Sequence, residues 1–94
     1  MSGLTIWKMQ LRPDADSYLL PKGAKILSVA FQHGSPQMWF LCNPAETERE
    51  VRILVFTGTG HAIEDIGEHK FIGTMLTDDQ SLVFHVLERV SAWM

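Results

Sequence analysis

The sequence has few of the features that mark a secreted or membrane-spanning protein. Its 94 residues include a single cysteine, Cys42, so no disulfide can form within the chain and nothing indicates an oxidising compartment. The longest apolar runs are far shorter than the roughly 20 residues that span a bilayer. The N-terminus has no basic region followed by a long apolar run, as a signal peptide would. We therefore expect a soluble intracellular protein without a membrane partner.

Basic residues are also scarce. Eight Lys and Arg against eleven Asp and Glu give a net charge of −3. Proteins that grip duplex phosphates usually carry a basic excess, so we expect no duplex nucleic acid as a partner. A chain of 94 residues has room for one domain, and its 46% apolar residues are sufficient for one core. We predict a single β-rich domain over residues 1–94.

The apolar residues mostly alternate with polar ones, which is typical of β-strands. The segment at 18–24 is extended but is broken by Pro21 and Gly23. The tetrapeptide HGSP at 33–36 predicts a hairpin with a four-residue connection, because glycine and proline favour turns. The pattern predicts strands over residues 4–11, 25–32, 37–42, 50–57 and 69–76.

The segment SLVFHVLERV at 81–90 fits two structures. Its apolar residues recur at helical spacing, but its β-branched and aromatic content favours a strand. A strand that is apolar on both faces needs cover on both, from a closed core or from another subunit. The predicted fold is mainly β, a single small antiparallel sheet or barrel of about six strands. It has little helix, and a short C-terminal helix is the alternative for residues 81–94.

Four short motifs occur in order along the chain. They are P-x-G-A-K-I-L from Pro21, G-T-G-H from Gly58, F-I-G-T from Phe71 and V-F-H-V-x-E from Val83. In these segments the chain resembles a family of short uncharacterised proteins encoded by tailed bacteriophages and prophages. The resemblance implies a phage or prophage origin, a β-rich fold and a location in the host bacterial cytoplasm. It implies no activity, so no catalytic residue is carried over.

The segment from Thr57 to His61, TGTGH, begins a connection of about a dozen residues, and long ordered loops are often functional. Successive backbone N–H groups of Gly58, Thr59, Gly60 and His61 can form an anion-binding nest, with threonine hydroxyls as further donors. The sequence lacks the third glycine or the Gly-Lys-Ser/Thr of known phosphate loops. The alternative is that the glycines only let the strand turn.

Metal binding and cysteine catalysis are not predicted. His61, Asp65 and His69 are spaced like ligands on one helical face, but Gly67 disfavours a helix there. In the run MWFLC, Cys42 is expected to be a small buried hydrophobic residue. We expect neither a metal nor a cofactor.

The C-terminal segment is the predicted contact surface of a homo-oligomer. The expected interface residues are Phe84, His85, Val86 and Trp93, because a tryptophan so near the chain end buries little area unless it docks on a partner. We expect His85 to lie in the core or the interface with its imidazole hydrogen-bonded to backbone.

These observations predict a non-enzymatic accessory protein of a phage or prophage. It would be a small binding module that acts on a host protein or sequesters a small anionic ligand, for example a nucleotide, with counter-defence as one role. The first alternative is a minor structural or assembly component of a virion. The second is a small phosphoester hydrolase that uses His61.

Overall fold

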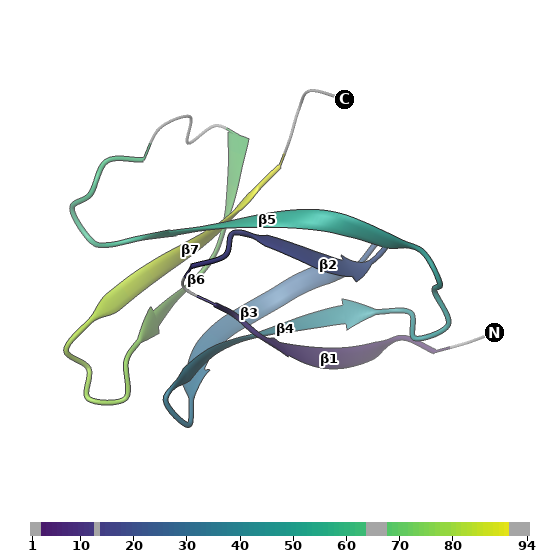
Figure 1. Ribbon diagram of the computed structural model, residues 1–94, viewed down its shortest axis with the longest axis horizontal. Coiled ribbons are helices and arrows are strands. Elements are labelled where there is room, and N and C mark those ends of the chain that lie inside the picture. Colours follow the sequence, from purple (N-terminus) through teal and green to yellow (C-terminus); the bar gives the residue numbers. More distant parts are fainter. Residues whose placement is uncertain (1–2, 13, 64–67, 91–94) are drawn as a thin grey trace.

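Seven antiparallel strands form two sheets that enclose one core (Figure 1). The computed structural model describes residues 3–12, 14–63 and 68–90. The predicted mainly antiparallel β fold is confirmed, but there are two sheets rather than one, and they do not close into a barrel. Within the described residues there is no helix long and apolar enough to cross a membrane. The strands are β1 (Thr5–Gln10), β2 (Ser17–Pro21), β3 (Lys25–Gln32), β4 (Ser35–Cys42), β5 (Arg49–Thr57), β6 (His69–Leu76) and β7 (Val83–Arg89).

The three-stranded sheet has the order β1-β4-β3. The β3–β4 hairpin turns over two residues, His33 and Gly34, whose φ angles are 54° and 80°. Positive φ at both central positions is typical of a type I′ turn, the tightest hairpin connection. The predicted four-residue connection is therefore wrong, because Ser35 and Pro36 already belong to β4. The Pro36 carbonyl accepts a hydrogen bond from the Leu11 N–H at 2.8 Å, so proline fills a strand position that needs only an acceptor.

The four-stranded sheet has the order β2-β5-β7-β6, and β5 is its long central strand. Residues 49–53 of β5 pair with β2, whereas residues 54–57 pair with β7. β7 therefore lies between β5 and β6, both of which precede it in the chain. The prediction of a strand rather than a helix in the C-terminal segment is confirmed for residues 83–89. The expected interface residue Trp93 lies outside the described residues.

The core lies between the two sheets and takes alternate residues from each strand. Leu20, Met38, Leu54 and Val86 are completely buried there. Cys42 is buried as predicted, and this burial raises the pKa of its thiol because the charged thiolate loses its hydration.

Tyr18 ties the β1–β2 connection to the core. Its ring is buried, and its hydroxyl donates to the Ala15 carbonyl at 2.9 Å and accepts from the Arg12 N–H at 3.1 Å. These bonds satisfy backbone groups in a segment that has left the sheet.

The two sheets also meet along β3 and β6, which pack against each other. Near this contact the rings of Phe31 on β3 and Phe84 on β7 stack, with centroids 6.2 Å apart and planes inclined by 29°. This aromatic pair bridges the two sheets beside the loop that follows β5.

Candidate functional site

The residues after β5 form a tight turn. The Gly58 carbonyl accepts the His61 N–H at 3.2 Å, and Gly60, the third residue of the turn, has a φ of 87°. This geometry is that of a type II turn, which requires positive φ at its third position and therefore favours glycine. The His61 N–H is used within the turn, so it is not a free donor of the expected anion nest.

Gly58 has a different role from Gly60. A Cβ atom built on Gly58 would lie 3.1 Å from Cε1 and 3.2 Å from Nδ1 of the His61 ring. The absence of a side chain at Gly58 thus lets the imidazole lie directly against the backbone of the turn that follows β5. This contact positions the only ionisable side chain of the predicted Thr57–His61 set.

Thr59 is tied to the sheet through His85. The Thr59 hydroxyl lies 2.6 Å from His85 Nε2, and the Thr74 hydroxyl of β6 lies 2.9 Å from His85 Nδ1. We expected the imidazole of His85 to bond to backbone, but the structure pairs it with these two side-chain hydroxyls. Because a hydroxyl can donate or accept, both contacts persist in the neutral and the protonated imidazole. The structure therefore joins two residues that the sequence suggested separately, one for a ligand and one for an interface.

A hollow of about 520 Å³ opens beside this turn. Its polar wall comes from the predicted Thr57–His61 segment, and its apolar wall comes from β5 and the start of β7. The lining residues are Phe56, Thr57, Gly58, Thr59, His61, Ala62, Leu82, Val83 and Phe84.

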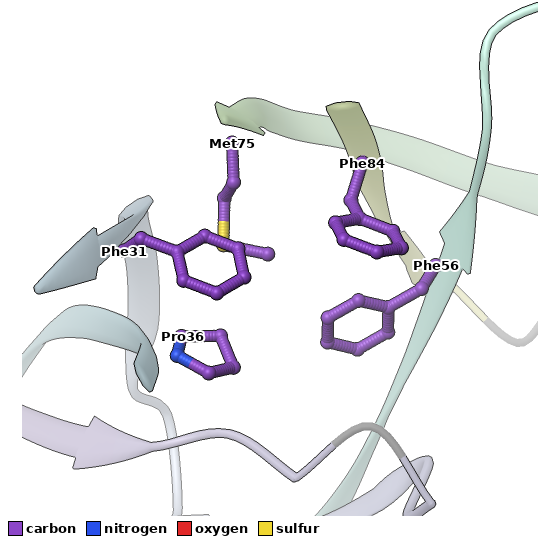
Figure 2. A pocket seen from close by; sticks show the side chains of 5 residues that line it. All are labelled: Phe31, Pro36, Phe56, Met75 and Phe84. Carbon is purple, nitrogen blue, oxygen red and sulfur yellow. The ribbon is translucent and has the colours of Figure 1, made fainter. Parts of the chain in front are cut away.

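A smaller apolar pocket of about 90 Å³ adjoins this hollow between the two sheets. Figure 2 shows the rings of Phe31, Phe56 and Phe84 with Met75 and Pro36 around one space. Phe56 and Phe84 line both cavities, so the apolar pocket lies next to the hollow beside the turn.

Sequence reasoning did not single out Phe31, Phe56 or Met75. The available signal was the alternation of the strands, which places Phe56 on the same face as Leu54.

A third hollow, of about 400 Å³, lies beyond the first residue of β2, where β5 continues past its pairing with that strand. Asp14, Ala15 and Asp16 line it together with residues 54–56 of β5, so it also includes Phe56. No lysine or arginine is among the described residues that line any of these three cavities. The surroundings of the site are therefore neutral or acidic.

The model of a known family matches residues 2–93, which is almost the whole chain. The chain belongs to the family described as "Domain of unknown function (DUF7352)". No curated protein and no solved structure gave a significant match. The family membership is consistent with one domain and assigns no activity.

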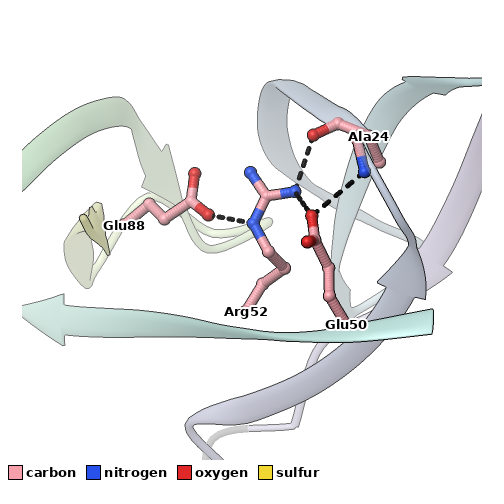
Figure 3. Close-up of polar contacts among 5 residues, drawn as sticks. Ala24, Glu50, Arg52 and Glu88 are labelled. Atoms are coloured by element: carbon pink, nitrogen blue, oxygen red, sulfur yellow. Dashed lines mark hydrogen bonds and ion pairs between the residues drawn. The ribbon is translucent and has the colours of Figure 1, made fainter. Parts of the chain in front are cut away.

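A buried ion pair braces the opposite end of the core of this DUF7352 domain (Figure 3). Nε of Arg52 on β5 is bonded to the Glu88 carboxylate of β7, and its Nη1 donates to the Ala24 carbonyl at 2.6 Å. Glu50 joins the cluster 3.3 Å from Nη1 and also accepts the Gly23 N–H at 3.1 Å. The Arg52 and Glu88 side chains are only 18% and 7% exposed. The cluster ties β5 and β7 to the β2–β3 turn.

The predicted interface residues point to different sides of β7. Val86 is completely buried within one chain, and Phe84 packs against the same core. Neither side chain is therefore presented on the outer face of the sheet, and the interface through them stays a prediction. His85 lies on the outer face, in one cross-strand row with Thr57 and Thr74.

The outer face of the four-stranded sheet is largely apolar. Val55, Leu87 and Phe71 form one cross-strand row, and Leu19 pairs with Val51 beside it. Phe71, Leu19 and Val51 are each about 60% exposed. The four-stranded sheet is thus apolar on both faces.

Asp65, one of the three residues considered for a metal, lies outside the described residues. Within the described part of the chain, no three His, Cys, Asp or Glu side chains gather as a metal site would require.

Proposed function

We propose that this protein is a non-enzymatic binding module of a phage or prophage, which holds a small ligand in the hollow after β5. The observation that carries the proposal is the shared wall of Phe56 and Phe84, which joins an apolar pocket to the polar Thr57–His61 turn. Small-molecule sites typically combine such an apolar lining with a few placed polar groups, in volumes of about 300–1,000 Å³.

The local structure also supports a preformed site. The Thr59–His85 contact holds the turn against the sheet, and the bare backbone of Gly58 lets the His61 ring lie close to the chain. A site that is ordered before binding loses less conformational entropy when the ligand arrives.

Native mass spectrometry of protein purified from a bacterial host tests the proposal. We expect a retained small molecule in the wild type and its loss in Phe56→Leu, which removes a ring from both cavities. Phe71→Leu is the matched control, because Phe71 is exposed on the outer face. Wild-type protein that carries no small molecule, and binds none from a bacterial metabolite extract, would refute the proposal.

Hydrolysis is a second candidate because of one contact. The 2.6 Å separation of the Thr59 hydroxyl and His85 Nε2 is that of a nucleophile and its base. Turnover of p-nitrophenyl phosphate or p-nitrophenyl acetate that disappears in both Thr59→Val and His85→Ala would support an enzyme built on this contact, and its loss in His61→Ala would support the predicted role of His61. No turnover of either ester by the wild type would count against this second candidate.

We also propose that the protein forms a homo-oligomer through the outer face of the four-stranded sheet, where Phe71 and Val51 are exposed. A sheet that is apolar on both faces is normally covered on both. Light scattering should show an oligomer for the wild type and a monomer for Phe71→Lys. A monomeric wild type at high concentration would rule out this assembly.

Two experiments address the remaining candidates. Affinity capture from host extract would reveal a host protein as partner, and the same Phe71→Lys variant shows whether the outer face holds it. Detection of the chain in purified virions would instead favour a structural or assembly role.

A further inference from the structure

The charges around the hollow restrict what it can hold. The residues that line the hollow and its apolar pocket include one ionisable side chain, His61, and no lysine or arginine. The sequence from Phe56 to His69 likewise contains no basic residue other than histidine. A phosphate that entered this site would lose hydration without gaining a fixed cation in return, which is unfavourable.

Several basic side chains of the described residues are already paired elsewhere. Arg52 binds Glu88, Glu50 and the Ala24 carbonyl, and Lys8 donates to Gln32 at 2.8 Å. On the other side of Phe56, Asp14 and Asp16 line the adjoining hollow and add negative charge. A net charge of −3 acts in the same direction at longer range.

The apolar pocket has the chemistry of a ring-binding site. Phe31 and Phe84 are stacked at 6.2 Å, and Phe56 and Met75 complete the walls around the open space in Figure 2. Aromatic rings and thioethers pack favourably on the face or edge of a further ring. The pocket volume of about 90 Å³ admits only part of a molecule, and the remainder would lie in the larger hollow.

The polar wall of the larger hollow offers neutral partners. The Thr57 and Thr59 side chains that line it are uncharged, the Thr59 hydroxyl already contacts His85, and His61 adds an imidazole that can donate or accept. Such groups suit hydroxyl, amide or ring-nitrogen atoms of a ligand. They do not neutralise a multiply charged anion.

From these observations we infer that the ligand is an uncharged, ring-bearing compound of the nucleoside type, and not a phosphorylated one. The inference rests on the proposed binding function and narrows it. It replaces the anionic ligand that the glycine-rich sequence suggested. The ring lies between Phe31, Phe56 and Phe84, and the hydroxyl-bearing part faces the Thr57–His61 turn.

The test compares matched pairs of probes at low salt, where charge effects are large. Adenosine and AMP, and uridine and UMP, are titrated against the protein by calorimetry and by amide NMR. We expect the nucleoside of at least one pair to bind about threefold or more tightly than its monophosphate. The amide shifts should fall on Phe56, Phe84 and residues 57–61.

A gain-of-function variant makes the charge argument sharper. Ala62 is exposed and lines the hollow, so Ala62→Lys places a cation where the wild type has none. It should raise AMP affinity about two- to fivefold, in a salt-sensitive way, and leave adenosine affinity unchanged. Ala45→Lys, in the exposed β4–β5 connection, is the control and should change neither.

The outcomes separate this inference from the function on which it rests. Tighter binding of the monophosphates, or binding of no nucleoside at all, would overturn the inference. The binding function would still stand if native mass spectrometry found another retained molecule, and would fall only if none were found.

Discussion

The imidazole of His85 holds the hydroxyl of Thr59 at 2.6 Å, so β7 anchors the turn that follows β5. These two residues are 26 positions apart in the sequence; Thr59 lines the candidate hollow, whereas His85 lies on the outer face of the sheet. The contact makes the geometry of the site depend on the pairing of the sheet beneath it.

Loss of the Thr59 hydroxyl should loosen this anchor. Thr59→Val keeps the shape of the side chain and removes the bond to His85, and we expect a loss of about 0.5–1.5 kcal/mol in unfolding free energy. Amide exchange in residues 57–61 should also become faster. Urea unfolding and hydrogen exchange measure both effects. Thr47→Val, in the exposed β4–β5 connection, is the control, and an equal loss in that variant would contradict the role of Thr59.

The Arg52–Glu88 pair should contribute much more than the exposed ion pair Lys22–Glu48. Glu88→Gln leaves a largely buried guanidinium with Glu50 as its remaining carboxylate partner, and we expect a loss near the lower end of about 3–5 kcal/mol. The side chains of Lys22 and Glu48 are 61% and 69% exposed, so Glu48→Gln should lower the unfolding free energy by only about 0–1 kcal/mol.

An apolar replacement of the whole pair provides the complementary test. Arg52→Met with Glu88→Leu should recover part of the loss, because no buried charge is left unpaired and the partly exposed Glu50 still accepts the Gly23 N–H. If the double variant loses as much unfolding free energy as the two single substitutions added together, the pair is not coupled.

Asp79 should make stability depend on pH in the acid range. Hydrogen bonds from the Ser81 N–H, the Ser81 hydroxyl and the Thr77 hydroxyl lower the pKa of this carboxyl from 3.8 to about 2. The unfolded chain therefore binds a proton first, so this contribution is complete above pH 3.8 and is lost as pH falls through about 2. Asp79→Asn should be less stable than wild type at neutral pH. Its unfolding free energy should also depend less on pH between pH 4 and 2. The same slope in both proteins would contradict this assignment, and Asp78→Asn is the neighbouring control.

The two glycines of the turn should respond differently to alanine. Gly60→Ala forces a side chain into positive φ and should cost about 1 kcal/mol or more in unfolding free energy. Gly58→Ala meets the His61 ring instead, so it should displace the imidazole and shift its NMR resonances with a smaller loss of stability.

The double substitution then separates structure from function. A Gly58→Ala, Gly60→Ala protein that folds and loses its ligand would show that the turn is a site. One that merely unfolds would show that the glycines serve the turn alone.

Much of the fold was predictable because alternation alone defines a strand. The bounds of β3 and β6 were predicted to the residue, and the C-terminal strand followed from its β-branched and aromatic content. The two-residue hairpin was missed because it places His33, a residue with a side chain, at positive φ. Local patterns also do not say which strands pair, so the division into two sheets was not foreseen.

The candidate site was predictable only in part. The Thr57–His61 segment carried visible turn chemistry, and it does line a hollow. The aromatic walls were hidden because Phe31, Phe56 and Phe84 belong to three strands whose ends meet only in the folded chain. The charge of the site was likewise a property of the assembled lining and not of the glycine motif.

The position of β7 between β5 and β6 has a consequence for how the chain folds. During synthesis, the residues of β5 and β6 leave the ribosome before the strand that joins them exists. Until β7 arrives, β6 has no hydrogen-bonded neighbour in its sheet, and residues 54–57 of β5 have an unpaired edge. Closure of the four-stranded sheet is therefore a late step that depends on contacts distant in sequence, and such steps are slow.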